Sequence, residues 1–471
     1  MNIDTVPTAP TFDITYPVVI VGAGACGLSA ALAASDAGLD VLVLERDKSP
    51  LGTTAMSTGL IPAAGTPEQQ ALAIDDSAAL FADDIQRKSG YGANALVVDK
   101  LAAESAETVA WLRDSHRVPL TLVTGFTYPG HSAKRMYGTP HRSGGELIAA
   151  LQTAASAAAV DLLTEALVED LIVDIDKQIL GVRVIRPDGA IEELGCGALI
   201  LACCGFAGNQ QMVADYIPEM ANAVFHGHPG NKGHAVRWGK QLGAGLADMG
   251  AYQGHGGLAH GYGIPILWPL IMQGGFQVNR DGRRFSDESN GYSEQAVEVL
   301  RQPGGIACSI FDQRLYQLML DFEDFNDAVS AGAIVRADNL ESLAQQLKLP
   351  FAALNDTVAE VRACARGSAV DSYRRDFTDT LVLQPPYYAA RVTGALFHTQ
   401  GGLEVDDNAR VLLANGEPLP NLYAGGGAAR GISGSGGAGY IAGNGLLTAT
   451  GLGKIAGRHA ARRLTAARSP G

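Results

Sequence analysis

The chain has 471 residues, more than one compact domain usually holds, so we expect two or three hydrophobic cores. Its 47% hydrophobic and 18% charged residues exclude a disordered chain, and its net charge of -14 excludes a broad positive field for nucleic acid or acidic lipid. The six cysteines show neither metal-ligand nor disulfide spacing. We expect a soluble, cytoplasmic protein with no metal, no nucleic-acid partner and no integral membrane association.

The first elements in chain order form a βαβ unit. From Pro17 the sequence PVVIVGAGACGLSAALAASDAGLDVLVLERD predicts a buried strand, a glycine turn, a helix and a second strand ending at Glu45. Gly22, Gly24 and Gly27 form GxGxxG between that strand and helix, where glycines allow a tight turn and close approach of a pyrophosphate. The Glu45 carboxylate suits the hydroxyls of an adenosine ribose. This context predicts a Rossmann-type dinucleotide-binding domain.

The remaining elements indicate a second domain inserted into the first. Residues 77–115 are expected to be helical, and residues 165–203 to form several short strands around a PDG turn. Aromatic and charged residues become more frequent between about 254 and 388, and the glycine-rich style returns before an expected C-terminal helix. We predict an α/β fold: a Rossmann-type cofactor domain from residues 1–253 and 391–471, with an inserted α+β capping domain at 254–390.

Three further stretches favour FAD over NAD. These are LGTTAMSTGLIPAAGT at 51–66, ALILACCGFAGN after the later strand, and LYAGGG before the C-terminal helix. With them, the chain resembles the flavoprotein family of soluble fumarate reductases and 3-ketosteroid dehydrogenases, and the resemblance covers nearly the whole chain. It implies that these stretches wrap FAD. The stretch TTAMSTG contains no histidine, where membrane-bound relatives attach flavin covalently, so we expect non-covalent FAD.

The resemblance also implies which residues contact the cofactor. Thr53, Thr54 and Ser57 are expected along the pyrophosphate and flavin. Val168 is expected near adenine, and residues 444–447 at the flavin edge and a helix N-terminus, which could stabilise the anionic reduced ring. The full expected set is Gly22, Ala23, Gly24, Ala25, Cys26, Gly27, Glu45, Arg46, Thr53, Thr54, Ser57, Thr58, Gly59, Val168, Cys203, Gly205, Gly426, Gly443, Asn444, Gly445, Leu446 and Leu447.

Two positions depart from the family pattern. Gly427 stands where the family usually has an acidic or amide residue, which removes one expected ribitol contact. Cys203 and Cys204 stand where Thr-Gly is common, and we interpret them as small core residues rather than reactive thiols.

The substrate residues set this chain apart from the fumarate reductases it resembles. Those enzymes bind a dicarboxylate with two histidines and two arginines, and His255 and His398 fall at the two histidine positions. Tyr292, after NRDGRRFSDE, takes the place of the proton-donating arginine, and Tyr440 takes the place of the carboxylate-clamping one. A phenol cannot form the bidentate fork that a carboxylate accepts, but it can donate one hydrogen bond to a ketone oxygen. A neutral carbonyl compound is therefore the predicted substrate.

Tyr292 and Tyr440 match the two tyrosines that the ketosteroid dehydrogenases use, so the resemblance implies an FAD-dependent dehydrogenase acting on CH–CH groups. It would introduce a double bond α,β to the ketone of a cyclic ketone or 3-ketosteroid. Tyr440 and a backbone N–H near Asn444 or Gly445 would polarise the carbonyl, Tyr292 would remove the α proton, and the β hydride would pass to flavin N5. The short capping domain favours a small ring. An external electron acceptor would then reoxidise the flavin.

Several alternatives remain open in the sequence. A tyrosine is a weak base at neutral pH, so a neighbour must assist Tyr292; the candidates are Tyr128, His255 and His398. The same site could run in reverse, as a reductase of an activated alkene such as an enone or a fumarate-like acid. A flavin-binding protein without catalysis and an oxidase using dioxygen are further alternatives. Arg283 and Arg284 are expected in ion pairs, although one could touch substrate.

Overall fold

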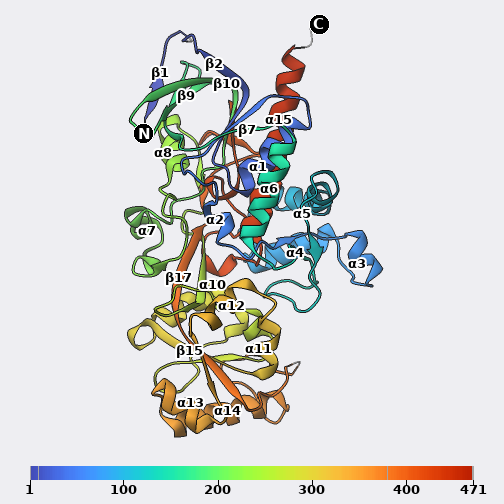
Figure 1. The fold of residues 1–471 in the computed structure, drawn as a ribbon, viewed down its shortest axis with the longest axis vertical. Helices are drawn as coiled ribbons and strands as arrows, with labels where there is room; N and C mark the ends of the chain where they lie inside the picture. Colours follow the sequence, from blue (N-terminus) through green and yellow to red (C-terminus); the bar gives the residue numbers. More distant parts are fainter. Residues whose placement is uncertain (1, 9, 379, 469–471) are drawn as a thin grey trace.

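The computed structural model describes residues 2–8, 10–378 and 380–468 as an elongated molecule with two bodies along its long axis (Figure 1). The upper body in that view contains both ends of the chain, and the lower body is built from the segment coloured yellow to orange. Separate clusters of buried side chains form the cores of the two bodies. The predicted α/β fold is confirmed.

The upper body is organised around a nine-stranded sheet whose central strands are parallel. Strand β10 pairs in parallel with β2 and with β20, so a strand from near the C-terminus lies inside the N-terminal sheet. The run Val18 to Ile20 is fully buried, as expected for a parallel strand covered on both faces. The strands are β1 (Ile3–Thr5), β2 (Ile14–Val21), β3 (Val41–Leu44), β7 (Asp161–Leu163), β8 (Leu167–Val173), β9 (Ile179–Ile185), β10 (Ile191–Leu201), β19 (Arg410–Leu412) and β20 (Pro418–Ala424).

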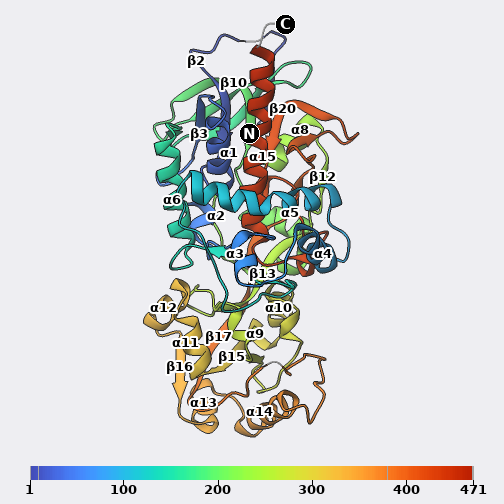
Figure 2. The ribbon, with the colours of Figure 1, turned by 90° about the vertical axis from the view of Figure 1, so that its right-hand side faces the viewer.

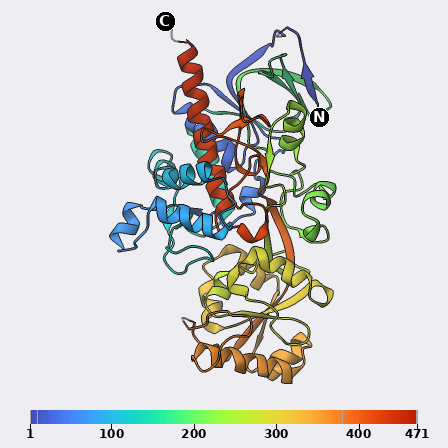
Figure 3. The ribbon, with the colours of Figure 1, turned by 180° about the vertical axis from the view of Figure 1, so that it is seen from behind.

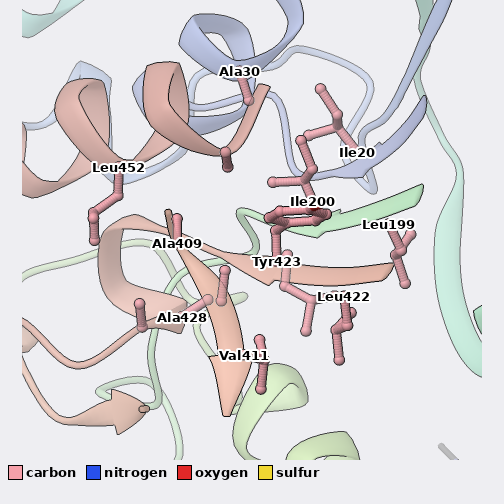
Figure 4. Close-up of a cluster of buried hydrophobic side chains, with 14 of the residues drawn as sticks. Ile20, Ala30, Leu199, Ile200, Ala409, Val411, Leu422, Tyr423, Ala428 and Leu452 are labelled. Carbon is pink, nitrogen blue, oxygen red and sulfur yellow. The ribbon is translucent and has the colours of Figure 1, made fainter. Parts of the chain in front are cut away.

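Helix α1 (Ala25–Ser35) packs tightly on the C-terminal helix α15 (Asn444–Arg468). A side chain at Gly453 would overlap the backbone of Cys26, and one at Gly457 the backbone of Ala30, so these glycines let the two helices approach closely. Figure 2 shows α15 running along the molecular axis, and Figure 4 shows the apolar side chains between the strands and this helix. The contact places the start of α15 beside the glycine turn.

The remaining helices of the upper body surround this core. The predicted helix over 77–115 is present but divided: α4 ends before Gly90 and Tyr91, which both have positive φ, and α5 continues into a π-helical turn at Trp111–Ser115. Ser77 and Asn94 cap the starts of α4 and α5 with their side chains. The helices are α2 (Gly52–Ala55), α3 (Pro67–Ala71), α4 (Ala78–Lys88), α5 (Ala95–Ala110), α6 (Gly144–Ala157), α7 (Gln210–Tyr216) and α8 (His234–Leu242).

The lower body is a six-stranded, mainly antiparallel sheet covered by short helices. Its strands are β11 (Val224–Phe225), β13 (Tyr252–Ala259), β14 (Phe276–Val278), β15 (Ile306–Asp312), β16 (Ile334–Ala337) and β17 (Tyr387–Thr399). Its helices are α9 (Pro269–Met272), α10 (Tyr292–Leu300), α11 (Gln313–Met319), α12 (Glu323–Ser330), α13 (Leu340–Leu347) and α14 (Phe351–Ala365). We call residues 260–386 the cap.

The antiparallel strands β13 and β17 join the two bodies. Figure 3 shows the long orange strand β17 passing from the lower body into the upper one. The predicted domain boundaries at 253/254 and 390/391 fall inside β13 and β17, so two continuous strands, rather than flexible linkers, form the connection. No helix in the described part of the chain has the length and apolar character needed to cross a lipid bilayer.

Candidate active site

A single cavity extends from the glycine turn of the upper body to the cap. Its walls include residues from strands, loops and helices that lie hundreds of positions apart in the sequence. Of the expected cofactor contacts, these line it: Gly22, Gly24, Ala25, Cys26, Glu45, Arg46, Thr53, Thr54, Ser57, Thr58, Val168, Cys203, Gly426, Gly443, Gly445 and Leu446. All five expected catalytic residues, Tyr128, His255, Tyr292, His398 and Tyr440, also line it.

The glycine turn leaves room for a large anionic ligand. Gly22 has a φ of 106°, and an added Cβ would lie 2.6 Å from the carbonyl oxygen of Ala202. Gly24 precedes α1 and provides no side-chain cap, so the start of the helix lies open at the cavity wall except at Ala25, whose N–H donates to Thr54 Oγ1. A helix N-terminus with this exposure is suited to a pyrophosphate. The residues present therefore fit the phosphate groups of a dinucleotide.

Glu45 is held in position by backbone amides. Its Oε2 accepts from the Ala23 N–H at 2.9 Å, and its Oε1 accepts from the Asp47 N–H at 3.0 Å. These bonds fix the carboxylate at the cavity wall, where a ribose hydroxyl could donate to it. Ala23 itself is fully buried and contributes through this amide rather than by lining the cavity.

Arg46 lies at the same end of the cavity, in contact with residues that sequence reasoning missed. Its guanidinium donates to Asp47 and to His228 Nδ1 at 3.2 Å, and it occupies the space beside Gly230 so closely that a side chain there would overlap it. Asn231 donates to Thr53 Oγ1 at 2.9 Å from the same loop. The glycine- and histidine-rich run HGHPGNKGH was the available signal for this contact.

The middle of the cavity is lined by the TTAMSTG stretch. Thr54 Oγ1 accepts from the Ala25 N–H at 3.0 Å and links this stretch to the start of α1. Opposite it, Cys204 has a φ of 64°, a left-handed conformation that a side chain disfavours, at the position where the family often has glycine. Burial raises the pKa of the Cys203 thiol to about 12, so this group is protonated at neutral pH. The cysteines thus behave as small packing residues.

The remaining expected cofactor contacts, Ala23 apart, are packed behind the cavity wall. A side chain on Gly27 would overlap the Gly22 carbonyl oxygen, one on Gly59 would meet Ser143, and one on Gly205 would overlap Thr399. These three glycines serve close packing rather than ligand contact. Leu447 lies in the buried core.

Asn444 also differs from expectation. Its side chain is fully buried and its Nδ2 donates to Ser433 Oγ at 2.7 Å, so Asn444 does not line the cavity. Its role is to anchor the start of α15. A second anchor is His131, whose Nε2–H donates to the carbonyl oxygen of Ala442 at 3.0 Å. Both bonds hold the loop that carries Tyr440.

Tyr292 stands at the end of the cavity nearest the cap, as the first residue of α10. Gly291 precedes it with a φ of 150°, and a side chain there would collide with Glu294. The Tyr292 ring centroid lies 5.9 Å from that of Tyr440 and 6.4 Å from that of Tyr128. The structure thus brings together three tyrosines from three distant segments.

The protonation of Tyr292 follows from this enclosed position. Burial raises its pKa well above the ordinary value, and the neighbouring phenols Tyr440 and Tyr128 raise it further. His255 stacks on Tyr292 with ring centroids 5.1 Å apart, but burial lowers the pKa of this histidine to about 3. Its Nδ1 already accepts from the Gly257 N–H at 3.0 Å, which leaves a neutral ring. His255 therefore orients Tyr292 without being protonated at neutral pH.

Tyr440 is positioned by the start of α15. Its hydroxyl oxygen accepts from the Gly445 N–H at 3.4 Å, a long bond that a ligand oxygen could replace. His398 packs edge-on against Tyr440 at 5.6 Å, and burial lowers its pKa to about 4. Phenol and amide together form a neutral pair of donors for a single oxygen atom.

Arginines are scarce at this cavity. Arg46, at the nucleotide end, is the one arginine among the described residues that line it. Arg284 is enclosed inside the cap, where it pairs with Glu288 at 2.8 Å and with Asp371, and Arg283 pairs with Asp356 near the surface at 3.1 Å. The predicted loss of a guanidinium clamp thus agrees with the arrangement of the described residues.

Other residues at the cap end escaped sequence reasoning because no motif marks them. They are Gln253, Pro265, Leu267, Trp268, Asp324, Phe397 and Gln400. Most are apolar or aromatic, which makes this end of the cavity suited to a largely apolar ligand.

The fold and the cavity define a flavoprotein oxidoreductase with an inserted cap. Residues 17–446 match the family described as "FAD binding domain", so the chain belongs to this family and binds FAD. When bound, FAD would be held by the glycine turn, Glu45 and the TTAMSTG stretch.

Known relatives of this chain include fumarate reductases. The chain is 28% identical to a probable fumarate reductase of Shewanella frigidimarina over 95% of this chain and 75% of the relative, and 26% identical to an NADH:fumarate oxidoreductase of Klebsiella pneumoniae. It spans 48% of the Klebsiella protein's length. Among solved structures, it is similar to an open flavocytochrome c3 fumarate reductase, with a TM-score of 0.79 and 28% identity over 96% of this chain and 79% of that one.

The ketosteroid enzymes share the fold. A 3-ketosteroid Δ4-(5α)-dehydrogenase from Rhodococcus jostii RHA1 gives a TM-score of 0.76 at 24% identity over 98% of this chain and 100% of that one. The suspected family is thereby confirmed, through the match to the FAD binding domain and the similarity to fumarate reductases, and the ketosteroid dehydrogenases have the same fold.

Proposed function

We propose that this protein is an FAD-dependent dehydrogenase that introduces a double bond α,β to the ketone of a cyclic substrate. One observation carries the proposal: Tyr292 and Tyr440 meet at the cap end of the cavity, and among the described lining residues no arginine stands beside them. An uncharged oxygen suits such a site better than a carboxylate does.

Tyr440 and Gly445 are the proposed carbonyl site. The Gly445 N–H donates to the Tyr440 hydroxyl oxygen, and a ketone oxygen that replaced this bond would accept from both the N–H and the phenol O–H. These donors stabilise the negative charge that grows on the oxygen as the α carbon loses its proton.

Tyr292 is the proposed acceptor of that α proton. FAD, when bound, supplies the acceptor for the hydrogen and the two electrons of the β C–H bond. The electron pair of the broken α C–H bond forms the second bond of the new C=C. The substrate thus loses two hydrogens and two electrons in total. The stacked, neutral His255 holds the Tyr292 ring against the substrate, and Tyr128 is the neighbour to which the proton can move on.

A second candidate is the reverse reaction, reduction of an activated alkene such as an enone. The observation in its favour is the raised pKa of Tyr292, because a neutral phenol is ready to donate a proton. The curated relatives are named as reductases, including a urocanate reductase of Eggerthella lenta and a vinyl phenol reductase of Lactiplantibacillus plantarum.

Anaerobic mixing of the purified protein with cyclohexanone, cyclohexenone and fumarate tests both candidates through the flavin absorbance. Bleaching of the oxidised flavin by cyclohexanone supports the dehydrogenase. Reoxidation of reduced protein by cyclohexenone, but not by fumarate, supports ketone chemistry in the reductive direction. Reoxidation by fumarate alone contradicts the proposal.

A further inference from the structure

One carboxylate in the cap lies at the cavity wall, and the chemistry above does not use it. Asp324 is the second residue of α12, its side chain lines the cavity, and the residue is only partly exposed. It reaches the cavity close enough to Tyr128 to influence the pKa of that phenol. It is thus the acidic group on the side of the cavity formed by the cap.

The segment that delivers Asp324 is fixed against the upper body. The guanidinium of Arg142 lies over the rings of Phe322 and Phe126, at 4.8 and 5.7 Å from their centroids, and pairs with Asp321 at 3.4 Å. These contacts hold the start of α12 over the cavity. Arg142 pairs with Asp321 through Nη2, while its Nη1 is buried without a hydrogen-bond partner among the described residues, and Asp324 on the next turn lines the cavity.

Within the described part of the chain, the Asp324 carboxylate accepts no hydrogen bond and forms no ion pair, whereas Asp321 three residues earlier is paired. The walls around it are aromatic, with Tyr128, Tyr292 and Trp268 lining the same region. Water solvates a carboxylate poorly in such surroundings. A ligand group that donates a hydrogen bond would therefore stabilise the carboxylate.

We propose that Asp324 selects substrates carrying a hydrogen-bond donor, a hydroxyl or a protonated amine, at the end of the molecule away from the reacting ketone. The inference rests on the proposed function, since Tyr440 and Gly445 orient the ketone toward the flavin side and leave the opposite end of the substrate toward the cap. Asp324 is a specificity-determining residue in this scheme and takes no part in the redox step.

The ionisation of Asp324 is consistent with this role. Burial, and then the carboxylates of Glu323 and Asp327 on the same helix, raise its pKa to about 7. Asp324 raises the pKa of the neighbouring Tyr128 phenol, and the guanidinium of Arg142, which pairs with Asp321, lowers the pKa of the same phenol. The carboxylate of Asp324 becomes ionised as the pH rises from 6 to 8, and the ionised form attracts a cationic substrate. The preference of the enzyme for a cationic over a neutral substrate should therefore increase over this pH range.

An aspartate in the first turn of a helix can also be purely structural, because it interacts favourably with the helix dipole. The two roles differ in what they do to substrate choice. A structural role would change stability, or the turnover of every ketone alike. A recognition role changes KM for donor-bearing ketones and leaves the parent ketone unaffected.

The experiment compares cyclohexanone and 2-decalone with their hydroxyl- and amino-substituted forms, 4-substituted and 6-substituted respectively, so that both short and long substrates are covered. The proteins are the wild type, Asp324→Asn, Asp324→Leu and the control Glu341→Gln, which alters an exposed carboxylate at the matching second position of another cap helix, α13. The measurements are kcat, KM, and the perturbation of the oxidised flavin spectrum on ligand binding.

We expect the wild type to favour a donor-bearing ketone over its parent by about tenfold or more in kcat/KM. Asp324→Leu should abolish this preference, and Glu341→Gln should retain it. Retention of the preference by Asp324→Asn identifies a hydroxyl as the recognised group, and its loss identifies an ammonium.

Equal kcat/KM for parent and substituted ketones in the wild type would overturn the inference. So would an equal loss for all substrates in Asp324→Leu. If no ketone or enone changes the flavin redox state, the proposed function fails instead. In that case, binding of the substituted ketones to the oxidised protein can still be measured from the change in the flavin absorbance spectrum. This measurement decides whether Asp324 recognises the donor.

Discussion

The two ends of the cavity are built in different ways. At the nucleotide end, short contiguous motifs supply the contacts, and much of the recognition surface is backbone: the start of α1, and the amides that hold Glu45. At the cap end, each important side chain comes from a different segment, as with Tyr128, Tyr292 and Tyr440. Cofactor binding is therefore encoded locally in this protein, whereas substrate choice depends on how the cap is placed.

Gly27→Val should have the largest effect, because the new side chain would overlap the Gly22 carbonyl oxygen beneath the glycine turn. We expect loss of bound FAD and of all activity, measured as the ratio of flavin to protein absorbance. Gly436→Ala is the matched control, since a Cβ there meets open space. Full flavin content in Gly27→Val would show that the nucleotide end is less dependent on this turn than its geometry indicates.

Tyr292→Phe tests the cap end. Loss of the phenol should lower turnover of a cyclic ketone by about 10²–10⁴-fold, the usual range for a lost acid or base, while FAD content is unchanged. Tyr316→Phe is a control within the cap, where Tyr316 packs on Tyr388 at 4.7 Å. Stopped-flow reduction of the flavin measures the effect, and an unchanged rate would remove Tyr292 from the mechanism.

The rate of flavin reduction should depend on pH in one direction, with a smaller effect than that of the Tyr292→Phe substitution. Because burial raises the pKa of Tyr292 above its ordinary value, the ionised base is scarce at neutral pH and increases by about tenfold per pH unit. Flavin reduction by cyclohexanone should therefore accelerate from pH 7 to pH 9 without a plateau. Reoxidation by an enone, which needs the neutral phenol, should stay nearly constant. A plateau near pH 7 for the first reaction would point to another base.

Cys204→Gly should have the smallest effect. Cys204 has a φ of 64°, so removing its side chain relieves a left-handed strain of about 1–2 kcal/mol. The greater freedom of glycine in the unfolded chain offsets part of this gain. We expect a rise of about 0.5–1 kcal/mol in the free energy of unfolding, measured by denaturant titration of the FAD-loaded protein, with Cys203→Ala as the control. A loss of stability would mean that the Cys204 thiol packs better than its backbone indicates.

Expectation and structure agree best where a motif and its contacts are adjacent in the chain. The βαβ unit, the glycine turn and the position of Glu45 were predictable, because hydrophobic periodicity and turn glycines act over a few residues. The division of the helix over 77–115 at Gly90 and Tyr91 was not predicted, although the run SGYGAN at 89–94 contains two glycines and the asparagine that caps α5, and such residues disfavour a helix interior.

The hydrogen-bond and ion-pair partners of a side chain were harder to predict than the part of the fold in which it lies. Asn444 was expected at the flavin edge but bonds to Ser433, and Arg284 pairs with Glu288 inside the cap. Asp324 escaped prediction altogether, since an acidic residue on a helix is ordinarily solvated. Ser433, the partner of Asn444, and Asp371, the second partner of Arg284, lie outside the local motif of each residue.

From the amino-acid sequence, the α/β fold and a dinucleotide site follow from residue types at short, fixed spacings, while FAD and the phenols in place of guanidinium groups are implied by the resemblance to the flavoprotein family. Only the tertiary structure decided which tyrosines touch, that His255 stays neutral and that a cap carboxylate reaches the cavity. The physical reason is that burial and the pairing of distant segments set protonation and access, and neither is a property of any local stretch of sequence.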